Sequence, residues 1–192
     1  VDSQQTVIFV SRPQRSNRID LMIEALKRLR EQRPGAKLIV VGKGPELDAL
    51  QALARQLGQD GHVLFPGAIY DEQKLAPWML SATLFCYPVN IGLSVLHAFG
   101  YGLPVVTSDK LTAQNPEIEA LEPHRHGLLY RHGEVDDMVR CWMRLMDSRR
   151  LRERMSEAAR DRVLQRYTIE NMVRGYLDAA RIVDGVERFV EA

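Results

Sequence analysis

The residues best suited to bind a charged group lie in the stretch from 88 to 106, which reads PVNIGLSVLHAFGYGLPVV. Its pattern predicts the end of a strand, a tight turn at Gly92, a short apolar helix and a second strand after Gly-Leu-Pro. The first turn of a helix carries unpaired N–H groups and the positive end of the helix dipole. The turn therefore predicts an anion site, with Gly92, Leu93 and Ser94 as candidate contacts.

Cationic side chains follow the first apolar run of the chain. Residues 11–18 read SRPQRSNR and contain Arg12, Arg15 and Arg18. The planar guanidinium fork matches a phosphate group, so this loop is a candidate phosphate-binding segment. A solvated basic loop that only caps a strand is the alternative, and the pattern alone favours it.

A second loop with a cation follows the next apolar run. Gly42 and Lys43 stand in VGKGPE, which is not a P-loop because the spacing to the lysine is wrong and no Ser or Thr follows it. The simplest interpretation is a tight turn in which Pro45 opens a helix. Lys43 faces the same end of the expected sheet as the arginines, and its role stays open.

These loops must be positioned by the elements around them. Apolar runs typical of strands cover 6–11, 36–41, 62–65, 83–87, 104–107 and 127–130, and helical patterns cover 18–33, 45–57, 71–81, 135–146, 149–166 and 169 to near the end. This alternation predicts an α/β fold, a Rossmann-like six-stranded parallel sheet flanked by helices, with strand order 3-2-1-4-5-6 and a helical C-terminal extension. Ligands of such a sheet bind beyond the carboxyl ends of its strands, where the loops above begin.

Composition argues against several functional classes. The 192 residues carry a formal net charge of +1, which predicts neither a nucleic-acid nor a membrane partner, and the arginines of 144–166 are interleaved with acids as on a solvated helix face. Cys86 and Cys141, without a secretory segment, fit a reducing cytoplasm. No apolar run approaches the roughly 20 residues that span a bilayer. The histidines from 124 to 132 are too irregular for a zinc site, so no metal is expected.

The stretch from 88 to 106 resembles the donor-binding signature of retaining GT-B glycosyltransferases of family 4, also called group 1. That signature runs roughly E-G-F-G-x-x-x-x-E-A-x-A-x-G-x-P-V, and the positions that match it are Gly92, Ala98, Gly102, Pro104 and Val105. The resemblance covers nearly the whole chain. It implies that residues 1–192 form a single domain, the C-terminal, nucleotide-sugar-binding half of a GT-B fold. The abrupt start shortly before a strand is expected of a fragment without the N-terminal, acceptor-binding domain.

The resemblance also assigns roles around the donor, and both family glutamates are replaced. Val89 stands at the position of the first glutamate, which in the family contacts the hydroxyl groups of the donor sugar. The neighbouring Asn90 could donate and accept hydrogen bonds there. His97 stands at the second, which contacts the ribose. A neutral imidazole could hold ribose hydroxyls, although a lone helical histidine is more often structural. The loop with Ile69 and Tyr70 would hold the nucleobase, largely through backbone groups, and Tyr70 as a mere helix-flanking residue is the alternative.

The family arginine and lysine positions both fall in the basic loop. Arg12 stands at the position of the family arginine. For this residue the resemblance therefore favours phosphate binding over a solvated basic loop. Asn17 lies on the family lysine, and Arg15 and Arg18 flank it and could supply the missing charge. A departing nucleoside diphosphate needs cations and N–H donors where no metal takes part. The expectation is a metal-independent reaction without a cofactor.

The resemblance implies a function for the whole enzyme. A hexosyl group would pass from a nucleotide sugar, UDP- or GDP-linked, to a saccharide or lipid-linked acceptor with retention, in bacterial surface polysaccharide synthesis. This chain alone would bind the nucleotide sugar without turnover, in the cytoplasm, with peripheral contact to the inner membrane only through the missing half. Two alternatives stay open. One is a non-catalytic nucleotide-binding module, which the missing glutamates and lysine favour, and the other is a GT-B-like sugar-nucleotide epimerase.

Overall fold

One parallel sheet forms the centre of the molecule. The computed structural model describes the backbone of residues 5–190 and the side chains of residues 5–182. The strands are β1 (Thr6–Val10), β2 (Lys37–Val41), β3 (Val63–Gly67), β4 (Leu84–Cys86), β5 (Val105–Ser108) and β6 (Gly127–Tyr130). Every neighbouring pair is parallel, and the order is β3-β2-β1-β4-β5-β6. The predicted topology of the sheet is confirmed.

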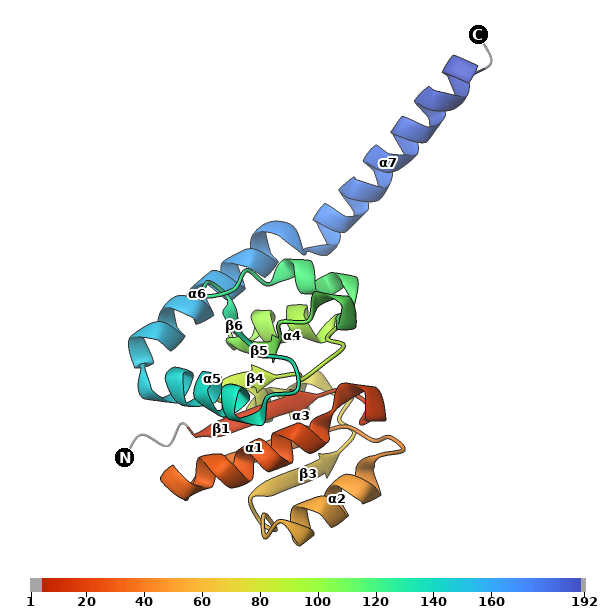
Figure 1. Ribbon diagram of the computed structural model, residues 1–192. Coiled ribbons are helices and arrows are strands. Elements are labelled where there is room, and N and C mark those ends of the chain that lie inside the picture. Colours follow the sequence, from red (N-terminus) through yellow and green to blue (C-terminus); the bar gives the residue numbers. More distant parts are fainter. Residues whose placement is uncertain (1–4, 191–192) are drawn as a thin grey trace.

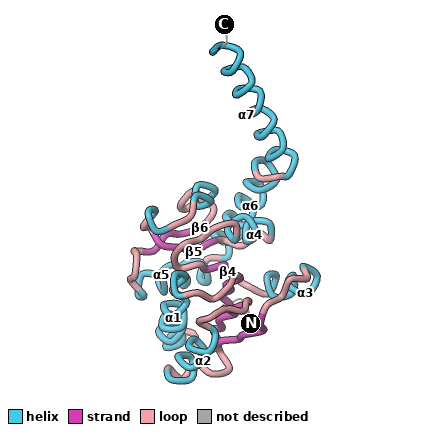
Figure 2. Tube along the Cα trace, turned by 90° about the vertical axis from the view of Figure 1, so that its right-hand side faces the viewer, coloured by secondary structure: helices cyan, strands magenta, loops and turns pink. Residues whose placement is uncertain are grey.

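Helices cover both faces of this sheet. Within residues 5–190 they are α1 (Ile19–Gln32), α2 (Leu47–Gln56), α3 (Glu72–Leu80), α4 (Ser94–Gly100), α5 (Val135–Asp147), α6 (Arg149–Arg166) and α7 (Ile169–Val190). Figure 2 shows α1, α2 and α5 on one side of the strands and α3, α4 and α6 on the other. Along α7 the chain extends away from the body, as the predicted C-terminal extension (Figure 1).

The central strands are apolar on both faces, as a sheet between two helical layers requires. Val7, Ile8 and Phe9 of β1 are fully buried, although their side chains point alternately to opposite faces. Trp142 of α5 and Phe99 of α4 are buried against this core as well. Because the packed core holds the strands in place, it also holds the loops that leave their carboxyl ends.

Local chemistry explains where three helices begin. The carboxylate of Asp71 accepts a hydrogen bond from the Gln73 amide at 3.0 Å, so Asp71 is the N-cap of α3, at the start of the helix predicted over 71–81. α1 begins at Ile19, one residue later than predicted, because Arg18 adopts a left-handed conformation with φ of 54°. α2 begins at Leu47, two residues later than predicted, after a turn.

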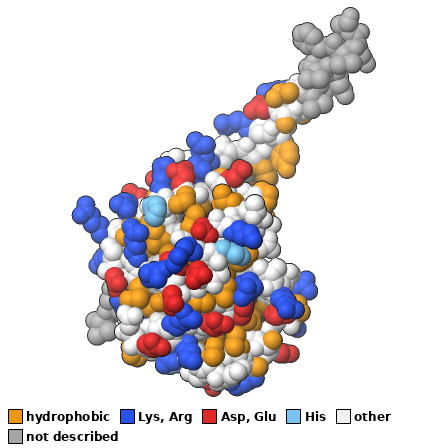
Figure 3. Space-filling model, viewed as in Figure 1, with side chains coloured by type: hydrophobic (Ala, Val, Ile, Leu, Met, Phe, Trp, Pro, Cys, Tyr) orange, Lys and Arg blue, Asp and Glu red, His pale blue; other side chains and the backbone are white. Residues whose placement is uncertain are grey.

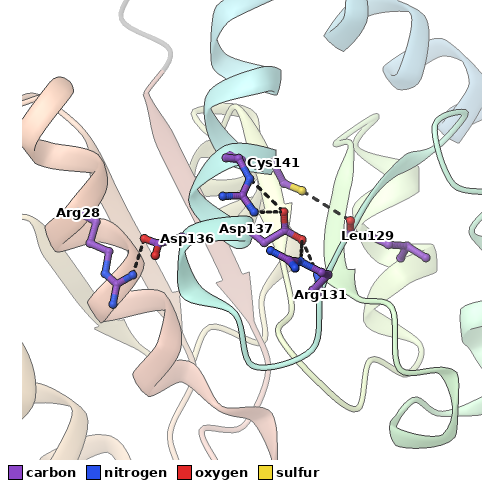
Figure 4. Close-up of polar contacts among 7 residues, drawn as sticks. Arg28, Leu129, Arg131, Asp136, Asp137 and Cys141 are labelled. Atoms are coloured by element: carbon purple, nitrogen blue, oxygen red, sulfur yellow. Dashed lines mark hydrogen bonds and ion pairs between the residues drawn. The ribbon is translucent and has the colours of Figure 1, made fainter.

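Charged contacts hold the first turns of α5 against the body (Figure 4). Asp136 pairs with Arg28 of α1. Asp137 accepts a hydrogen bond from the Arg131 amide at 2.6 Å and one from the Arg140 guanidinium at 2.7 Å. Burial raises the pKa of the Asp137 carboxyl, but these hydrogen bonds and the two positive charges outweigh it, and its net pKa is lowered.

We expect Asp137→Ala to lower the free energy of unfolding at neutral pH by about 1–2 kcal/mol, because it removes hydrogen bonds to a charged group. A carboxyl group with a lowered folded-state pKa stabilises the fold above its ordinary pKa of 3.8, and loses that effect as the pH falls through the folded-state value. The difference between wild type and variant should therefore shrink below pH 3.8 in denaturant unfolding. Asp136→Ala, which removes a more exposed carboxylate of the same helix, should lower the free energy of unfolding by less. Equal losses for the two variants would contradict the prediction.

Charge is distributed without a single-sign patch on the face that Figure 3 shows, where Lys and Arg side chains lie among Asp and Glu side chains. Among the described residues, no helix combines the length and the apolarity needed to cross a membrane.

Candidate functional site

A pocket of about 830 Å³ opens beyond the carboxyl ends of β1, β2 and β3, with α3 and α4 contributing to its wall. Six of the residues predicted from the sequence line it, namely Arg12, Gly42, Lys43, Ile69, Tyr70 and His97. They come from four separate loops or helices of the chain. The edge of the sheet that the parallel topology predicts for a ligand is therefore the edge where the pocket lies.

Gly42 shapes the floor of this pocket. Its φ is +154°, and a Cβ atom at this position would lie 2.0 Å from the carbonyl oxygen of Ser11. Its amide donates to the carbonyl of Gly67 at 2.9 Å. Only glycine lets the ends of β1, β2 and β3 approach this closely, so the residue has a structural role at the site.

Arg12 and Lys43 bring positive charge to the pocket. Both side chains are exposed, and neither forms an ion pair or hydrogen bond with any residue that the structure describes. Side-chain cations without acidic partners are available to a phosphate group. The two residues follow neighbouring strands, which is why both line the pocket although they lie 31 positions apart in the sequence.

The turn before α4 lies beside the same strand end. The hydroxyl of Ser94 donates to the carbonyl of Val10 at 3.4 Å, which confirms that the turn and the segment with Arg12 share one edge of the sheet. Among the described residues, the amides of 92–94 have no hydrogen-bond partner. Asn90, with φ of 68°, accepts a hydrogen bond through its carbonyl from the side chain of Asn115 at 3.0 Å. The turn is thus held from the loop after β5, while its amides stay open.

Arg15 and Arg18 line a different hollow, of about 470 Å³, together with Asp20 and Glu46. The Arg18 guanidinium pairs with Asp20 at 2.9 Å, and this hydrogen bond raises the pKa of Arg18. The structure therefore does not bring these two arginines together with Arg12. Their proposed role as replacements for the family lysine stays a prediction.

The family lysine position carries a structural amide in this chain. Asn17 is only 3% exposed. Its side chain donates to the hydroxyl of Tyr87 at 3.0 Å and accepts from the amide of Gln14 at 2.9 Å. Val89, at the first family glutamate, is also buried. Neither residue can contact a ligand in the pocket.

His97 reaches a partner that the sequence did not reveal. Its Nε2 atom lies 3.0 Å from Oε1 of Glu72, the first residue of α3. The hydroxyl of Tyr101, which directly follows the last residue of α4, also donates to Oε1. His97 and Glu72 both line the pocket. The imidazole therefore lies at the pocket, as predicted, but it is bound to a carboxylate of the protein.

A second carboxylate lies at the turn before α4. A methyl group placed on Gly92 would be 3.9 Å from both carboxylate oxygens of Glu117. Glu117 lies in the first turn of the 3-10 helix Pro116–Ala120, and Glu72 lies in the first turn of α3. An acid in the first turn of a helix is favourable by itself. The sequence therefore carries no local signal that separates either acid from an ordinary capping residue.

Metal ligands were not expected from the sequence. In the part of the chain that the structure describes, no group of at least three His, Cys, Asp or Glu side chains is arranged to hold a metal ion. The predicted independence from metals stays a prediction, since binding has to test it.

A sheet of this order, with a pocket beyond the carboxyl ends of its strands, defines a Rossmann-like domain. The family model described as glycosyl transferases group 1 matches residues 1–162. The chain therefore belongs to the group 1 glycosyltransferases, as its signature indicated. Its fold is that of the C-terminal domains of GT-B enzymes.

Known proteins share this fold at low sequence identity. A S. aureus TarM variant matches with a TM-score of 0.82 at 20% identity, over 92% of this chain and 35% of that chain. HepE of Anabaena, in complex with UDP, matches with a TM-score of 0.77 at 21% identity, over 93% of this chain and 49% of that chain. A GDP-mannose-dependent alpha-(1-6)-phosphatidylinositol monomannoside mannosyltransferase of Mycobacterium tuberculosis is 26% identical over 92% of this chain and 47% of its own length. The chain spans about half the length of the curated relatives it matches.

Proposed function

We propose that this chain is the donor-binding domain of a retaining hexosyltransferase that uses a UDP- or GDP-linked sugar. Membership of the group 1 glycosyltransferases supports sugar transfer. The name of the mycobacterial relative includes GDP-mannose, and HepE was crystallised with UDP, which supports a nucleoside diphosphate as the leaving group. A relative in Rhizobium meliloti named for lipopolysaccharide core biosynthesis supports a saccharide or lipid-linked acceptor in bacterial surface glycan synthesis.

The observation that carries this proposal is the pair of unpartnered cations, Arg12 and Lys43, in the pocket beyond β1 and β2. When the bond between the anomeric carbon and the β-phosphate oxygen breaks, negative charge grows on the diphosphate. Fixed cations stabilise that charge, and they do so more strongly where the pocket excludes water. The open amides of the turn before α4 are further donors at the same edge. These groups together would replace a metal ion.

Isothermal titration of this 192-residue chain with UDP, GDP and ADP tests the proposal. We expect one of the three to bind with a dissociation constant in the micromolar range, about −8 kcal/mol, and orthophosphate to bind far more weakly. We expect the same affinity in magnesium and in EDTA, because the cations are side chains of the protein. Absence of binding by all three nucleotides would contradict the proposed function. A loss of affinity in EDTA would contradict its metal independence.

A non-catalytic nucleotide-binding module is the second candidate. It is favoured by the buried Val89 and the buried, hydrogen-bonded Asn17, which stand at two charged positions of the family and cannot reach a ligand. The sugar moiety separates the two candidates. A donor-binding domain should bind UDP-glucose or GDP-mannose differently from the free nucleotide, since it contacts the sugar. A nucleotide-binding module should bind both alike in the same titration.

A further inference from the structure

One carboxylate lines the pocket, and only one of its two oxygen atoms is hydrogen-bonded to the residues that the structure describes. Among the residues that line the pocket, Glu72 is the single acid. Its Oε1 atom accepts hydrogen bonds from His97 Nε2, at 3.0 Å, and from the Tyr101 hydroxyl. Its Oε2 atom has no hydrogen-bond partner in the described part of the chain. The carboxylate is thus oriented by the protein and keeps one acceptor for a ligand.

The two donors also set the charge of this group. The hydrogen bond from Tyr101 has the largest effect and lowers the pKa of Glu72, and the hydrogen bond from His97 lowers it further. Burial and the hydrogen bond to Glu72 raise the pKa of Tyr101 to about 12. At neutral pH the carboxylate is therefore ionised and the phenol keeps its proton to donate. The His97 and Tyr101 rings meet edge to face, with centroids 5.5 Å apart, so the two donors support each other's position.

An ionised carboxylate selects the part of a ligand that it can bind. It repels a phosphate group, which Arg12 and Lys43 attract instead. It accepts hydrogen bonds from hydroxyl or N–H donors. Glu72 lies two positions after Tyr70, on the loop proposed for the nucleobase, and it is bonded to His97, three positions after Ser94 in the turn proposed for the phosphates. In a nucleotide, the ribose joins these two parts.

We propose that Glu72 binds the ribose of the nucleotide, with Oε2 accepting hydrogen bonds from the vicinal 2′- and 3′-hydroxyl groups, and that His97 and Tyr101 are positioning residues that act through it. This inference rests on the proposed function, since it names the group that recognises part of the same ligand. The sequence predicted that His97 itself contacts the ribose. The structure favours Glu72 instead, because Nε2 of His97 is already hydrogen-bonded to Oε1 of Glu72.

The test uses the nucleotide among UDP, GDP and ADP that binds best, together with its 2′-deoxy analogue, in isothermal titration. Wild type should prefer the ribonucleotide about tenfold. Glu72→Gln should lower affinity for the ribonucleotide about tenfold, and affinity for the 2′-deoxy analogue by clearly less because that analogue keeps only the 3′-hydroxyl, so that the preference for the ribonucleotide shrinks. Glu31→Gln, at an exposed glutamate of α1 outside the pocket, should change neither value. Thermal unfolding of each variant checks that the fold is intact.

The outcomes separate this inference from the proposed function. If Glu72→Gln lowers both affinities equally, or keeps the preference for the ribonucleotide, the carboxylate does not bind the 2′-hydroxyl and the inference is wrong. If the variant changes the ranking of UDP, GDP and ADP instead, the carboxylate contacts the base, which also overturns the inference while the proposed function stands. If wild type binds no nucleotide, both are wrong.

The positioning residues have their own readout, the ratio of ribonucleotide to 2′-deoxynucleotide affinity. Tyr101→Phe and His97→Ala should each lower ribonucleotide affinity about two- to tenfold and lower this ratio, because they release one side of Glu72. His97→Gln, whose amide can still donate to Oε1, should restore part of the ratio. A purely structural effect would weaken both nucleotides equally and leave the ratio unchanged, which would refute the positioning role.

Discussion

Alanine at position 42 should destabilise the fold by about 3 kcal/mol and remove nucleotide binding together with that stability. The added methyl group would lie 2.0 Å from the carbonyl oxygen of Ser11, and 2.9 Å from a ring carbon of Pro13. Both contacts are with the segment that leaves β1, so the chain can relieve them only by moving the ends of β1 and β2 apart. The same movement would displace Arg12 and Lys43, which follow these strand ends.

Denaturant unfolding and nucleotide titration of Gly42→Ala measure the two effects. Gly100→Ala is the matched control, because a Cβ atom at that glycine, the last residue of α4, meets no atom within 4 Å. It should be neutral or slightly stabilising, since alanine favours a helix over glycine by up to about 1 kcal/mol. A Gly42→Ala variant as stable as wild type would show that the close approach of the strand ends is not required.

The Arg12→Ala variant should bind its nucleoside diphosphate about 1.5–3 kcal/mol more weakly, which is the usual contribution of a hydrogen bond to a charged group. Arg12 lines the pocket and has no acidic partner among the described residues, so its charge is free for the ligand. Stability should hardly change, because the side chain is exposed and makes no contact that the fold requires. Loss of binding without loss of stability is the expected signature.

Arg15→Ala is the control for charge alone. Arg15 is an exposed arginine of the same loop, but it lines the separate hollow beside Arg18 and Asp20. A general attraction between a basic loop and an anion would weaken equally in the two variants. A ligand bound in the pocket should discriminate between them, with most of the loss at Arg12. Equal losses in titration would contradict the assignment of the phosphate site to the pocket.

The architecture could be predicted almost completely. The parallel sheet, its strand order and the helical extension were all predicted from periodicity and turn residues, and the structure confirms them. Errors were confined to boundaries, such as the start of α2 at Leu47. Strand and helix periodicities are local properties of the chain, and an alternating order of elements admits few topologies.

The site was predicted in part. Arg12, Lys43 and Gly42 could be placed at one edge because parallel strands send their carboxyl ends to the same side. Arg15 and Arg18 have the same residue type and lie a few positions away, yet they line another hollow. Their direction depends on the 3-10 helix Arg15–Asn17, which contains Arg15, and on the left-handed backbone of Arg18 that follows it, and no sequence period specifies either.

The amino-acid sequence by itself determined the family, the sheet and the edge of the sheet at which the pocket lies, since these follow from repeated local patterns and a motif in consecutive residues. Only the tertiary structure decided which charges share the pocket and what His97 contacts. Glu72 lies 25 positions before His97, on another helix, and its hydrogen bonds arise from the packing of α3 beside α4. Contacts between side chains on separate elements depend on the relative position of whole elements, and this position is a property of the assembled core.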